Sequence, residues 1–369
     1  MEPFKNEFSY LNALRISSAL ARVDPNFPTA RFRRGLEIAL EPLELKQRMH
    51  LIADRLEACL PLPTPQLFQL LVQTLAKDEA DSQGLRGFIV WPLTEIVARR
   101  GLEFFDDAML ALRAMTSRFT AEFAIRPFLR RQLQRTLQQL EKWGDDPDPH
   151  VRRLVSEGSR PFLPWGERLP EILADPQLTL GLLERLHRDP SPYVRLSVAN
   201  HLNDFSKAHP DLVIKTLSRW QSQAPDCPHI ARLTRHACRT LIKQGHPTAL
   251  ALHGYGSAEN LSLEEYALTE TSVALGGSLG YRLVVKNRSS ESLRVLFDYA
   301  ILHCKANGTQ TPKVFKGRQR TLAPGEIWQI QARHSFKIVT TRVYHPGLHG
   351  FEPRLNGKAF PHLEFLVQI

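Results

Sequence analysis

Two segments of the chain, 43 residues apart, begin a helix in the same way. Residues 146–149 read Asp-Pro-Asp-Pro, and residues 189–192 read Asp-Pro-Ser-Pro. An acidic residue can cap the open N–H groups of a helix, and a proline at the first helical position has no N–H to satisfy. A period of 43 residues is typical of the two-helix repeats of HEAT-type solenoids, which are roughly 40–47 residues long. The sequence therefore predicts a curved stack of helix pairs.

Apolar residues follow both helix starts at helical spacing, for example Val151, Leu154 and Val155. We expect these to pack against neighbouring repeats. The polar residues between them are expected to face outward or into a groove: Arg152, Arg153, Glu157, Arg160, Arg195, Asn200, Asn203 and Asp204. A third, degenerate copy is expected to start near Asp226 and to include residues 235–245, with its register left open.

The hydrophobic pattern changes near residue 260. Before it, apolar residues recur every three or four positions, as in 63–77 and 127–142, which predicts helices. After it, they alternate with polar residues, as in 281–285 and 293–301. Turn pairs separate these runs at Gly276-Gly277, Asn307-Gly308, Pro324-Gly325, Pro346-Gly347 and Asn356-Gly357. We therefore expect an α solenoid of HEAT-like repeats over residues 1–257, followed by an all-β immunoglobulin-like sandwich over residues 262–369.

Composition limits the class of protein. A chain of 369 residues with 43% apolar residues can bury a large core. No uncharged apolar run is long enough to span a bilayer, and the N-terminus lacks a secretion-signal pattern, so we expect a cytoplasmic protein with no membrane partner. The four cysteines show no CxxC spacing, which favours reduced thiols over disulfides or zinc. His345 and His349 lack a third metal ligand nearby, so no metal site is expected.

The basic balance of the chain favours a polyanionic partner. The formal net charge is +10, and residues 261–369 contain 14 Lys and Arg against 8 Asp and Glu. Nucleic acid is the commonest polyanion that binds such proteins. The basic run Lys313, Lys316, Arg318 and Arg320 fits phosphate contact. It fits equally well a strand edge whose charges prevent aggregation.

Several strings resemble bacterial DNA alkylation-repair glycosylases of the AlkC type. These strings are 118–128 (RFTAEFAIRPF), 151–165, 194–204 and 239–243, and 1–6 and 43–49 are similar as well. The resemblance spans most of residues 1–255 in order, and some members of this group carry an appended immunoglobulin-like domain. It implies a monofunctional, monomeric enzyme of base excision repair that needs no cofactor. Its partner would be double-stranded DNA containing alkylated bases.

The resemblance also implies a reaction and a site. The enzyme would hydrolyse the N-glycosidic bond of 3-methyladenine, with 3-methylcytosine left open, without flipping the base out of the duplex. The methylated base already carries a positive charge, so it can leave without a strong general acid. The enzyme would therefore have to stabilise the oxocarbenium-like sugar that forms as the bond breaks. Carried over position by position, the catalytic residues are Glu122, Glu157, Trp165 and Asp204.

Each of these four residues also has a structural interpretation. Glu157 follows Arg153 by four residues, as in a helix-surface ion pair. Glu122 fits a pair with Arg118 or Arg126, and Asp204 fits a helix end that bonds local backbone. Trp165, in a loop set by two nearby prolines, fits a core plug.

Phosphate contacts are expected from basic residues near helix ends, although some of these fit solvated surface charges. The candidates are Arg152, Arg153, Arg160, Lys207, Arg235, His236, Arg239 and Lys243. Two classes of function therefore remain: a DNA glycosylase, and a non-enzymatic HEAT-type scaffold that binds DNA or a protein partner. Only the glycosylase requires the carboxylates and Trp165 to meet in one groove.

Overall fold

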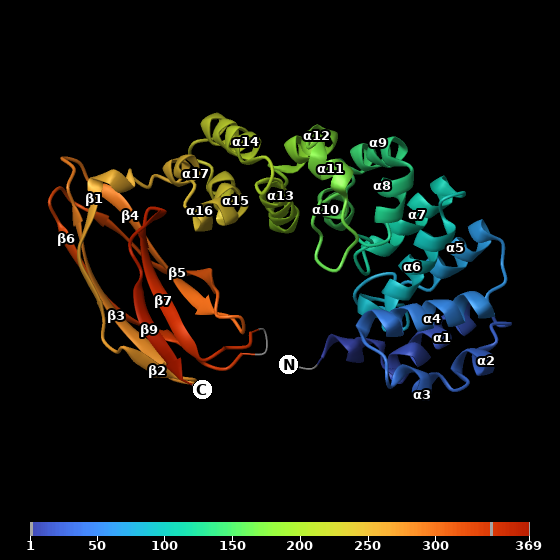
Figure 1. Cartoon of the computed structure of the whole chain (residues 1–369). Coiled ribbons are helices and arrows are strands. Elements are labelled where there is room, and N and C mark those ends of the chain that lie inside the picture. Colours follow the sequence, from blue (N-terminus) through green and yellow to red (C-terminus); the bar gives the residue numbers. More distant parts are fainter. Residues whose placement is uncertain (1–2, 340–341, 369) are drawn as a thin grey trace. The chain divides into compact units, whose positions relative to one another are not determined.

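A computed structural model describes residues 3–339 and 342–368, so Met1 and Glu2 of the N-terminal string lie outside the described residues. Helices occupy the chain up to Leu252, and strands begin at Leu261 (Figure 1). The expected fold class is confirmed: helical repeats precede an immunoglobulin-like β-sandwich. Within the described ranges, no helix is both long enough and apolar enough to span a membrane.

The helices are α1 (Tyr10–Val23), α2 (Thr29–Arg33), α3 (Leu36–Leu40), α4 (Leu45–Cys59), α5 (Thr64–Gln73), α6 (Trp91–Arg100), α7 (Phe105–Thr116), α8 (Arg126–Arg131), α9 (Leu133–Trp143), α10 (Pro149–Gly158), α11 (Pro170–Ala174), α12 (Gln177–Leu186), α13 (Pro192–Phe205), α14 (Pro210–Gln223), α15 (Pro228–Ala237), α16 (Arg239–Gln244) and α17 (Pro247–Leu252), with short 3-10 helices η1 (Phe4–Phe8), η2 (Gly87–Val90) and η3 (Ala258–Asn260). The strands are β1 (Leu261–Leu268), β2 (Ser272–Ala274), β3 (Ser278–Asn287), β4 (Leu293–Cys304), β5 (Gln310–Leu322), β6 (Ile327–Ser335), β7 (Gly347–Leu355), β8 (Lys358–Ala359) and β9 (Leu363–Gln368).

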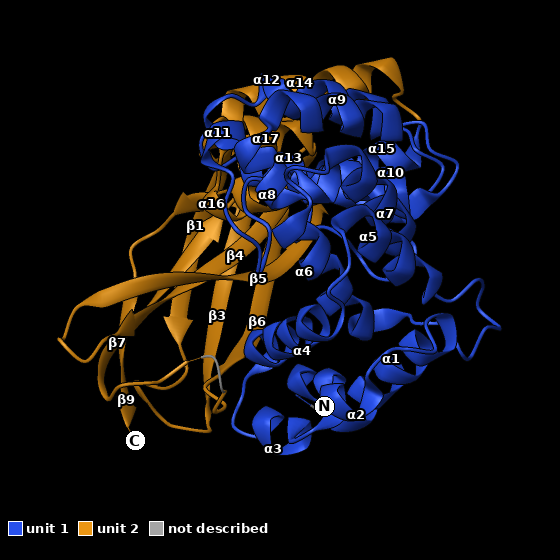
Figure 2. Ribbon diagram, turned by 90° about the vertical axis from the view of Figure 1, so that its right-hand side faces the viewer, with its two compact units in different colours: residues 1–208, 227–237 blue, residues 209–226, 238–369 orange. Residues whose placement is uncertain are grey.

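Contacts divide the chain into two compact units (Figure 2). Unit 1 holds residues 1–208 and 227–237, and unit 2 holds residues 209–226 and 238–369. Unit 2 therefore joins α14, α16 and α17 to the strands. The change from helix to strand falls between Leu252 and Leu261, inside unit 2. We propose residues 1–257 and 262–369 as the helical domain and the β domain. This division follows the change of secondary structure and differs from the two units defined by contacts.

The expected helix starts are present, and a third follows them. Helices α10, α13 and α15 each begin with a proline, at Pro149, Pro192 and Pro228. Helix α10 packs on α13, and α13 packs on α15. The third start fixes the register that the sequence left open, and a short break at Cys238 separates α15 from α16.

The repeated acidic residue joins neighbouring repeats. Asp146 accepts a bond from Arg113 at 2.6 Å, and Asp189 accepts one from Arg152, also at 2.6 Å. Each aspartate also accepts the backbone N–H two residues later, and only Asp148 caps its helix directly. The repeated aspartate thus holds a turn and an ion pair, where the sequence predicted a helix cap.

The segment 127–142 forms two helices, where its periodicity predicted one. Gln132 has φ −137° and ψ 49°, which ends α8 before α9 begins. Its side-chain amide donates to the Leu102 carbonyl at 2.6 Å. This tertiary contact outweighs a helix preference that is worth only a few tenths of a kcal/mol per residue, as an order of magnitude.

The C-terminal strands form two sheets around one apolar core. The smaller sheet has the order β1-β3-β6, and the larger has β2-β9-β7-β4-β5, with β8 paired to β7. Alternating residues of β3 and β4, among them Leu283, Val285, Val295 and Phe297, fill the core. The expected turns at Gly276-Gly277, Asn307-Gly308, Pro324-Gly325 and Asn356-Gly357 lie between strands, whereas Gly347 of the Pro346-Gly347 pair begins β7.

Three buried histidines make this sandwich sensitive to acid. His303, His334 and His349 lie around Phe336, and in the described part of the chain one ring nitrogen of each lacks a hydrogen-bond partner. Burial lowers the pKa of His303 to about 3 and that of His334 to about 4, and the neighbouring cations Arg342 and Lys313 act in the same direction. The folded sandwich therefore holds these rings neutral.

We expect the free energy of unfolding of this protein to fall between about pH 7.5 and about pH 5. A depressed histidine pKa gives stability that is complete above the ordinary value of about 6.5 and is lost as the pH falls toward the folded value. The loss by pH 5 is at most about 2 kcal/mol per histidine. Urea unfolding at both pH values measures it. His334→Gln should shrink the pH effect, and an unchanged effect in that variant would refute this account.

Candidate active site

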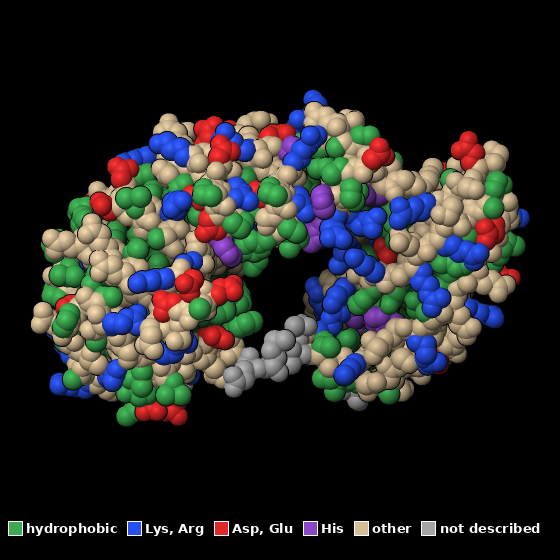
Figure 3. Space-filling view, turned by 180° about the vertical axis from the view of Figure 1, so that it is seen from behind, with side chains coloured by type: hydrophobic (Ala, Val, Ile, Leu, Met, Phe, Trp, Pro, Cys, Tyr) green, Lys and Arg blue, Asp and Glu red, His purple; other side chains and the backbone are tan. Residues whose placement is uncertain are grey.

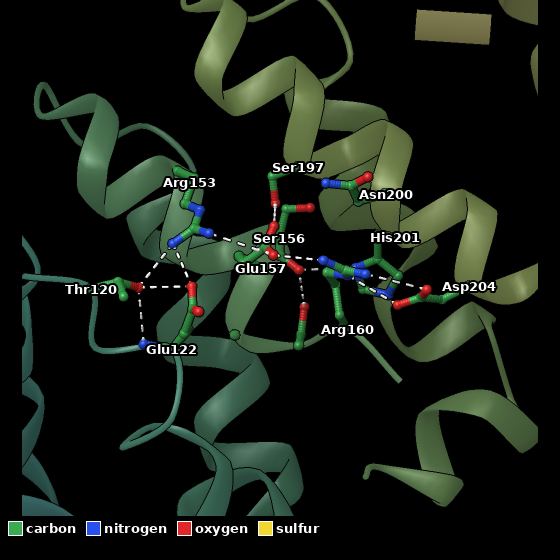
Figure 4. Close-up of polar contacts among 12 residues, drawn as sticks. Thr120, Glu122, Arg153, Ser156, Glu157, Arg160, Ser197, Asn200, His201 and Asp204 are labelled. Atoms are coloured by element: carbon green, nitrogen blue, oxygen red, sulfur yellow. Dashed lines mark hydrogen bonds and ion pairs between the residues drawn. The ribbon is translucent and has the colours of Figure 1, made fainter. Parts of the chain in front are cut away.

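A polar stripe on α10 faces a polar stripe on α13 (Figure 4). Arg153, Glu157 and Arg160 follow helical spacing along and just past α10, and Ser197 and Asp204 do so on α13. Residues spaced by three, four or seven positions lie on one helical face. The two helices pack against each other, so these side chains meet between them.

The side chains form a continuous chain of ion pairs. Glu122, in the loop before α8, binds Arg153 at 2.5 Å. Glu157 lies 3.4 Å from Arg153 and 2.6 Å from Arg160. Arg160 in turn binds Asp204 at 2.9 Å. Three carboxylates share two guanidinium groups, so these five side chains carry a formal charge of −1.

The cluster is withdrawn from solvent. Glu157, Arg160 and Asp204 are each at most 6% exposed. Burial raises the pKa of the Asp204 carboxyl, against the opposing influence of Arg160. His201 is fully buried beside the cluster, its Nδ1–H donates to the Ser156 carbonyl oxygen at 3.0 Å, and burial lowers its pKa to about 3. Near neutral pH His201 is therefore neutral and adds no charge to the cluster.

A pocket of about 290 Å³ opens over part of this cluster. Glu122 and Glu157 supply its acidic part, and aromatic rings supply most of the rest. It is lined by Phe88, Trp91, Phe119, Thr120, Glu122, Phe123, Glu157, Leu163, Pro164 and Trp165. The rings of Trp91 and Phe123 stack at 4.6 Å between centroids. Asp204 does not line the pocket. It is linked to Glu157, in the pocket wall, through their shared partner Arg160.

Trp165 is the exposed wall of this pocket. Its side chain is 51% exposed, and its backbone has φ +63°. A residue other than glycine in this region costs on the order of 1–3 kcal/mol and persists only where its surroundings hold it. Arg126 stabilises this loop, because its guanidinium donates to the carbonyls of Gly158, Arg160 and Glu167. Burial lowers the pKa of Arg126 to about 10.

The structure contradicts several of the purely structural roles that the sequence suggested for the four candidate catalytic residues. Glu122 pairs with Arg153, whereas Arg118 and Arg126 both bind backbone carbonyls. Trp165 is exposed and does not plug the core. The Arg153–Glu157 pair exists, but it is buried in the cluster rather than solvated.

Burial and bonding also differ from the expectations for Asp204 and the repeat polar residues. Asp204 binds Arg160 and the Phe162 N–H, not the local backbone of its own helix end. The polar residues of both repeats were expected to face outward or into a groove: Glu157 lines the pocket, whereas Arg160, Arg195, Asn203 and Asp204 are buried and do not face outward.

Three of the candidate phosphate-binding residues are committed to ion pairs, and the others are exposed or half-buried. Arg152, Arg153 and Arg160 make ion pairs with Asp189, Glu122 and Asp204 respectively. Lys207 and Arg235 are exposed in unit 1, and the Lys207 ammonium lies 4.4 Å from the centre of the Phe162 ring. His236 bonds the Asn200 side chain at 2.8 Å. In unit 2, Lys243 is exposed and Arg239 is half-buried.

Two site residues were missed by the sequence analysis. The Ser197 hydroxyl donates to Glu157 at 2.6 Å, and the Thr120 hydroxyl donates to Glu122 at 2.9 Å. Ser197 lies seven residues before Asp204, so helical spacing alone places it on the same face of α13. Thr120 lies in a loop, where no periodic signal exists.

Comparison with known proteins agrees with this architecture. A family model described as DNA alkylation repair enzyme matches residues 113–244, and one described as the C-terminal Ig-like domain of the uncharacterised protein YhaZ matches residues 262–369. Uncharacterized protein YhaZ of Bacillus subtilis (strain 168) is 37% identical over 345 residues, which cover 93% of each chain. The structure of Pseudomonas fluorescens alkylpurine DNA glycosylase AlkC, bound to DNA containing an abasic site analog, is 35% identical, with a TM-score of 0.91 and complete coverage of both chains.

The fold and the site thus define a helical-repeat protein of the DNA alkylation-repair class with an acidic, aromatic pocket. The chain carries the appended Ig-like domain as well. It belongs to the AlkC-type family of DNA alkylation-repair glycosylases.

Proposed function

We propose that the protein is a monofunctional DNA glycosylase that removes cationic alkylated bases from double-stranded DNA. The substrate we favour is 3-methyladenine, with 3-methylcytosine as a second candidate. The base leaves by hydrolysis of its N-glycosidic bond, without being flipped out of the duplex, and an abasic site remains. The observation that carries this proposal is the meeting of Glu122, Glu157 and Trp165 in one pocket.

The chemistry follows from the charge of the site. The leaving base is already cationic, so it needs no strong general acid, and the developing charge is on the sugar. The net negative cluster attracts an oxocarbenium-like sugar, and it does so more strongly because water is excluded. The face of Trp165 adds a cation–π attraction of about 1–2 kcal/mol once bound DNA excludes water from it. We assign Glu122, Glu157, Trp165 and Asp204 to this role.

The proposal assigns DNA contact to basic residues that are exposed or, for Arg239, half-buried. Lys207, Arg235, Arg239 and Lys243 are assigned to phosphate, with His236 as a further hydrogen-bond donor. Exposed cations of β5, namely Lys313, Lys316, Arg318 and Arg320, extend the basic surface of unit 2, and Lys and Arg side chains gather along this edge of the sandwich in Figure 3. We propose that the Ig-like domain contacts DNA there and that the protein acts as a cytoplasmic monomer.

Lys207→Ala should weaken DNA binding at every sequence and reduce the salt slope of binding by about one, because one phosphate contact is lost. Arg152→Ala should instead lower the free energy of unfolding, because its guanidinium is committed to Asp189. Binding titrations at several salt concentrations and urea unfolding separate the two effects. The reverse pattern would assign phosphate contact to Arg152.

A non-enzymatic scaffold is the alternative function. Repeat solenoids are most often binding proteins, and the exposed cations suit a DNA-binding scaffold too. The two functions are distinguished by release of free base from methylated duplex DNA by the purified protein, without added metal. Release of 3-methyladenine supports the glycosylase. Absence of release, with tight and salt-sensitive DNA binding retained, supports the scaffold.

A further inference from the structure

The N-terminal segment of the chain contacts the pocket, although it is far from the other pocket residues in sequence. Phe4 lies in η1, and its ring contacts the Trp165 indole edge to face with 5.9 Å between centroids. The Phe4 ring also stacks on Phe88, a residue of the pocket wall, with 5.8 Å between centroids. Phe4 is half exposed, as is Trp165. Phe4 therefore packs against the wall of the pocket and is not buried in the core.

A second contact from the same region holds the Trp165 backbone. The Lys46 ammonium, on α4, donates to the Trp165 carbonyl oxygen. The segment that carries Phe4 is itself anchored to this part of the chain. Lys5 binds Glu44 at 2.8 Å, and Arg48 donates to the Lys5 carbonyl at 3.2 Å. The ring and the backbone of Trp165 are thus held by residues more than a hundred positions earlier in the sequence.

The conformation of Trp165 needs such support. Its positive φ is unfavourable for any side chain beyond glycine, and an exposed indole has little core packing to fix it. Arg126 fixes the two ends of the loop, but its contacts are to Gly158, Arg160 and Glu167 and not to Trp165 itself. Contacts to the indole ring and to its own carbonyl therefore come from Phe4 and Lys46.

We propose that Phe4 and Lys46 are positioning residues that hold the Trp165 indole over the acidic pocket. This inference rests on the proposed glycosylase function, and it extends the functional site to a part of the chain that the DNA alkylation repair model, at residues 113–244, does not cover. Catalysis depends on placement, since a shift of about 1 Å in a group at a reaction site can cost on the order of a hundredfold in rate.

The test is a double-mutant cycle measured by single-turnover release of 3-methyladenine at saturating protein. Phe4→Ala should slow release by roughly tenfold to a hundredfold with little change in DNA affinity. In a Trp165→Ala background, Phe4→Ala should add less than about a twofold loss, because Phe4 acts through Trp165. Lys46→Met should behave like Phe4→Ala. Leu11→Ala, which removes an exposed apolar side chain on α1 away from the pocket, is the control and should change nothing.

Iodide quenching gives a readout that does not depend on activity. Of the five tryptophans, Trp91, Trp143, Trp220 and Trp328 are buried, so quenching by iodide reports Trp165. Subtracting the signal of Trp165→Ala isolates it. Phe4→Ala and Lys46→Met should each raise the Trp165 quenching constant, and Leu11→Ala should not.

Three outcomes would overturn the proposal. These are an unchanged release rate in Phe4→Ala, an equal loss in the presence and absence of Trp165, and an unchanged quenching constant. If the wild-type protein releases no base, the proposed function fails, and the quenching comparison alone decides whether Phe4 and Lys46 position Trp165.

Discussion

Replacing Glu157 with glutamine is expected to slow release of 3-methyladenine by about 10²–10³-fold, the range typical of losing one preorganised electrostatic group. The substitution keeps the shape of the side chain and an oxygen that can accept from Ser197. It removes one negative charge, which leaves the cluster of three carboxylates and two guanidinium groups neutral. A neutral site no longer attracts the developing charge on the sugar.

The effect should appear in the chemical step and not in binding. DNA affinity should stay within a few-fold, as an order of magnitude, because the lost interaction forms only in the transition state. Single-turnover release and a binding titration on the same methylated duplex measure the two quantities. Glu171→Gln, which removes an exposed carboxylate from α11, is a matched control and should release base at the wild-type rate.

Asp204→Asn should also slow release, because it too neutralises the cluster. Its effect should be smaller, since Asp204 lies behind Arg160 and not in the pocket wall. Release at the wild-type rate in both carboxylate variants would remove this mechanism. Release lost in Asp204→Asn alone would assign the main electrostatic role to the second repeat.

Arg160→Met is expected to have the largest effect on stability. Arg160 is buried and binds Glu157 and Asp204 together, so its removal leaves two buried carboxylates without their main partner. Breaking a buried ion pair from one side costs about 3–5 kcal/mol. Urea unfolding near neutral pH should show a loss of this order.

The pH dependence of this loss identifies its cause. Burial already raises the pKa of Asp204, and without Arg160 that pKa should rise further. A raised carboxyl pKa means that the folded protein binds more protons than the unfolded chain, so acidification stabilises it. The deficit of Arg160→Met relative to wild type should therefore shrink as the pH falls. A deficit that is independent of pH would point to lost packing instead of unpaired charge.

Arg130→Met is the matched control for charge removal. Arg130 binds Glu167 and Glu171 at the surface, and exposed pairs of this kind contribute at most about 1 kcal/mol. A loss in Arg130→Met as large as that in Arg160→Met would show that burial of the cluster is not the source of the effect.

The sequence by itself determined that helical repeats precede strands and where two of the repeat helices start. Prolines and aspartates placed the starts of α10 and α13 43 residues apart, and alternating apolar residues predicted β3 and β4. These signals act within a few residues, through fixed proline φ angles, turn residues and the burial of one face. The resemblance to a family named Glu122, Glu157, Trp165 and Asp204, and the structure brings the first three to one pocket.

Only the tertiary structure decided which residues meet. Glu122 binds Arg153 rather than a nearer arginine, because α10 brings Arg153 beside its loop. Trp165 is exposed and not in the core, and Phe4 and Lys46, from the N-terminal part of the chain, contact it. A contact between residues more than a hundred positions apart depends on how helices stack, and the local pattern around either residue contains no information about that packing.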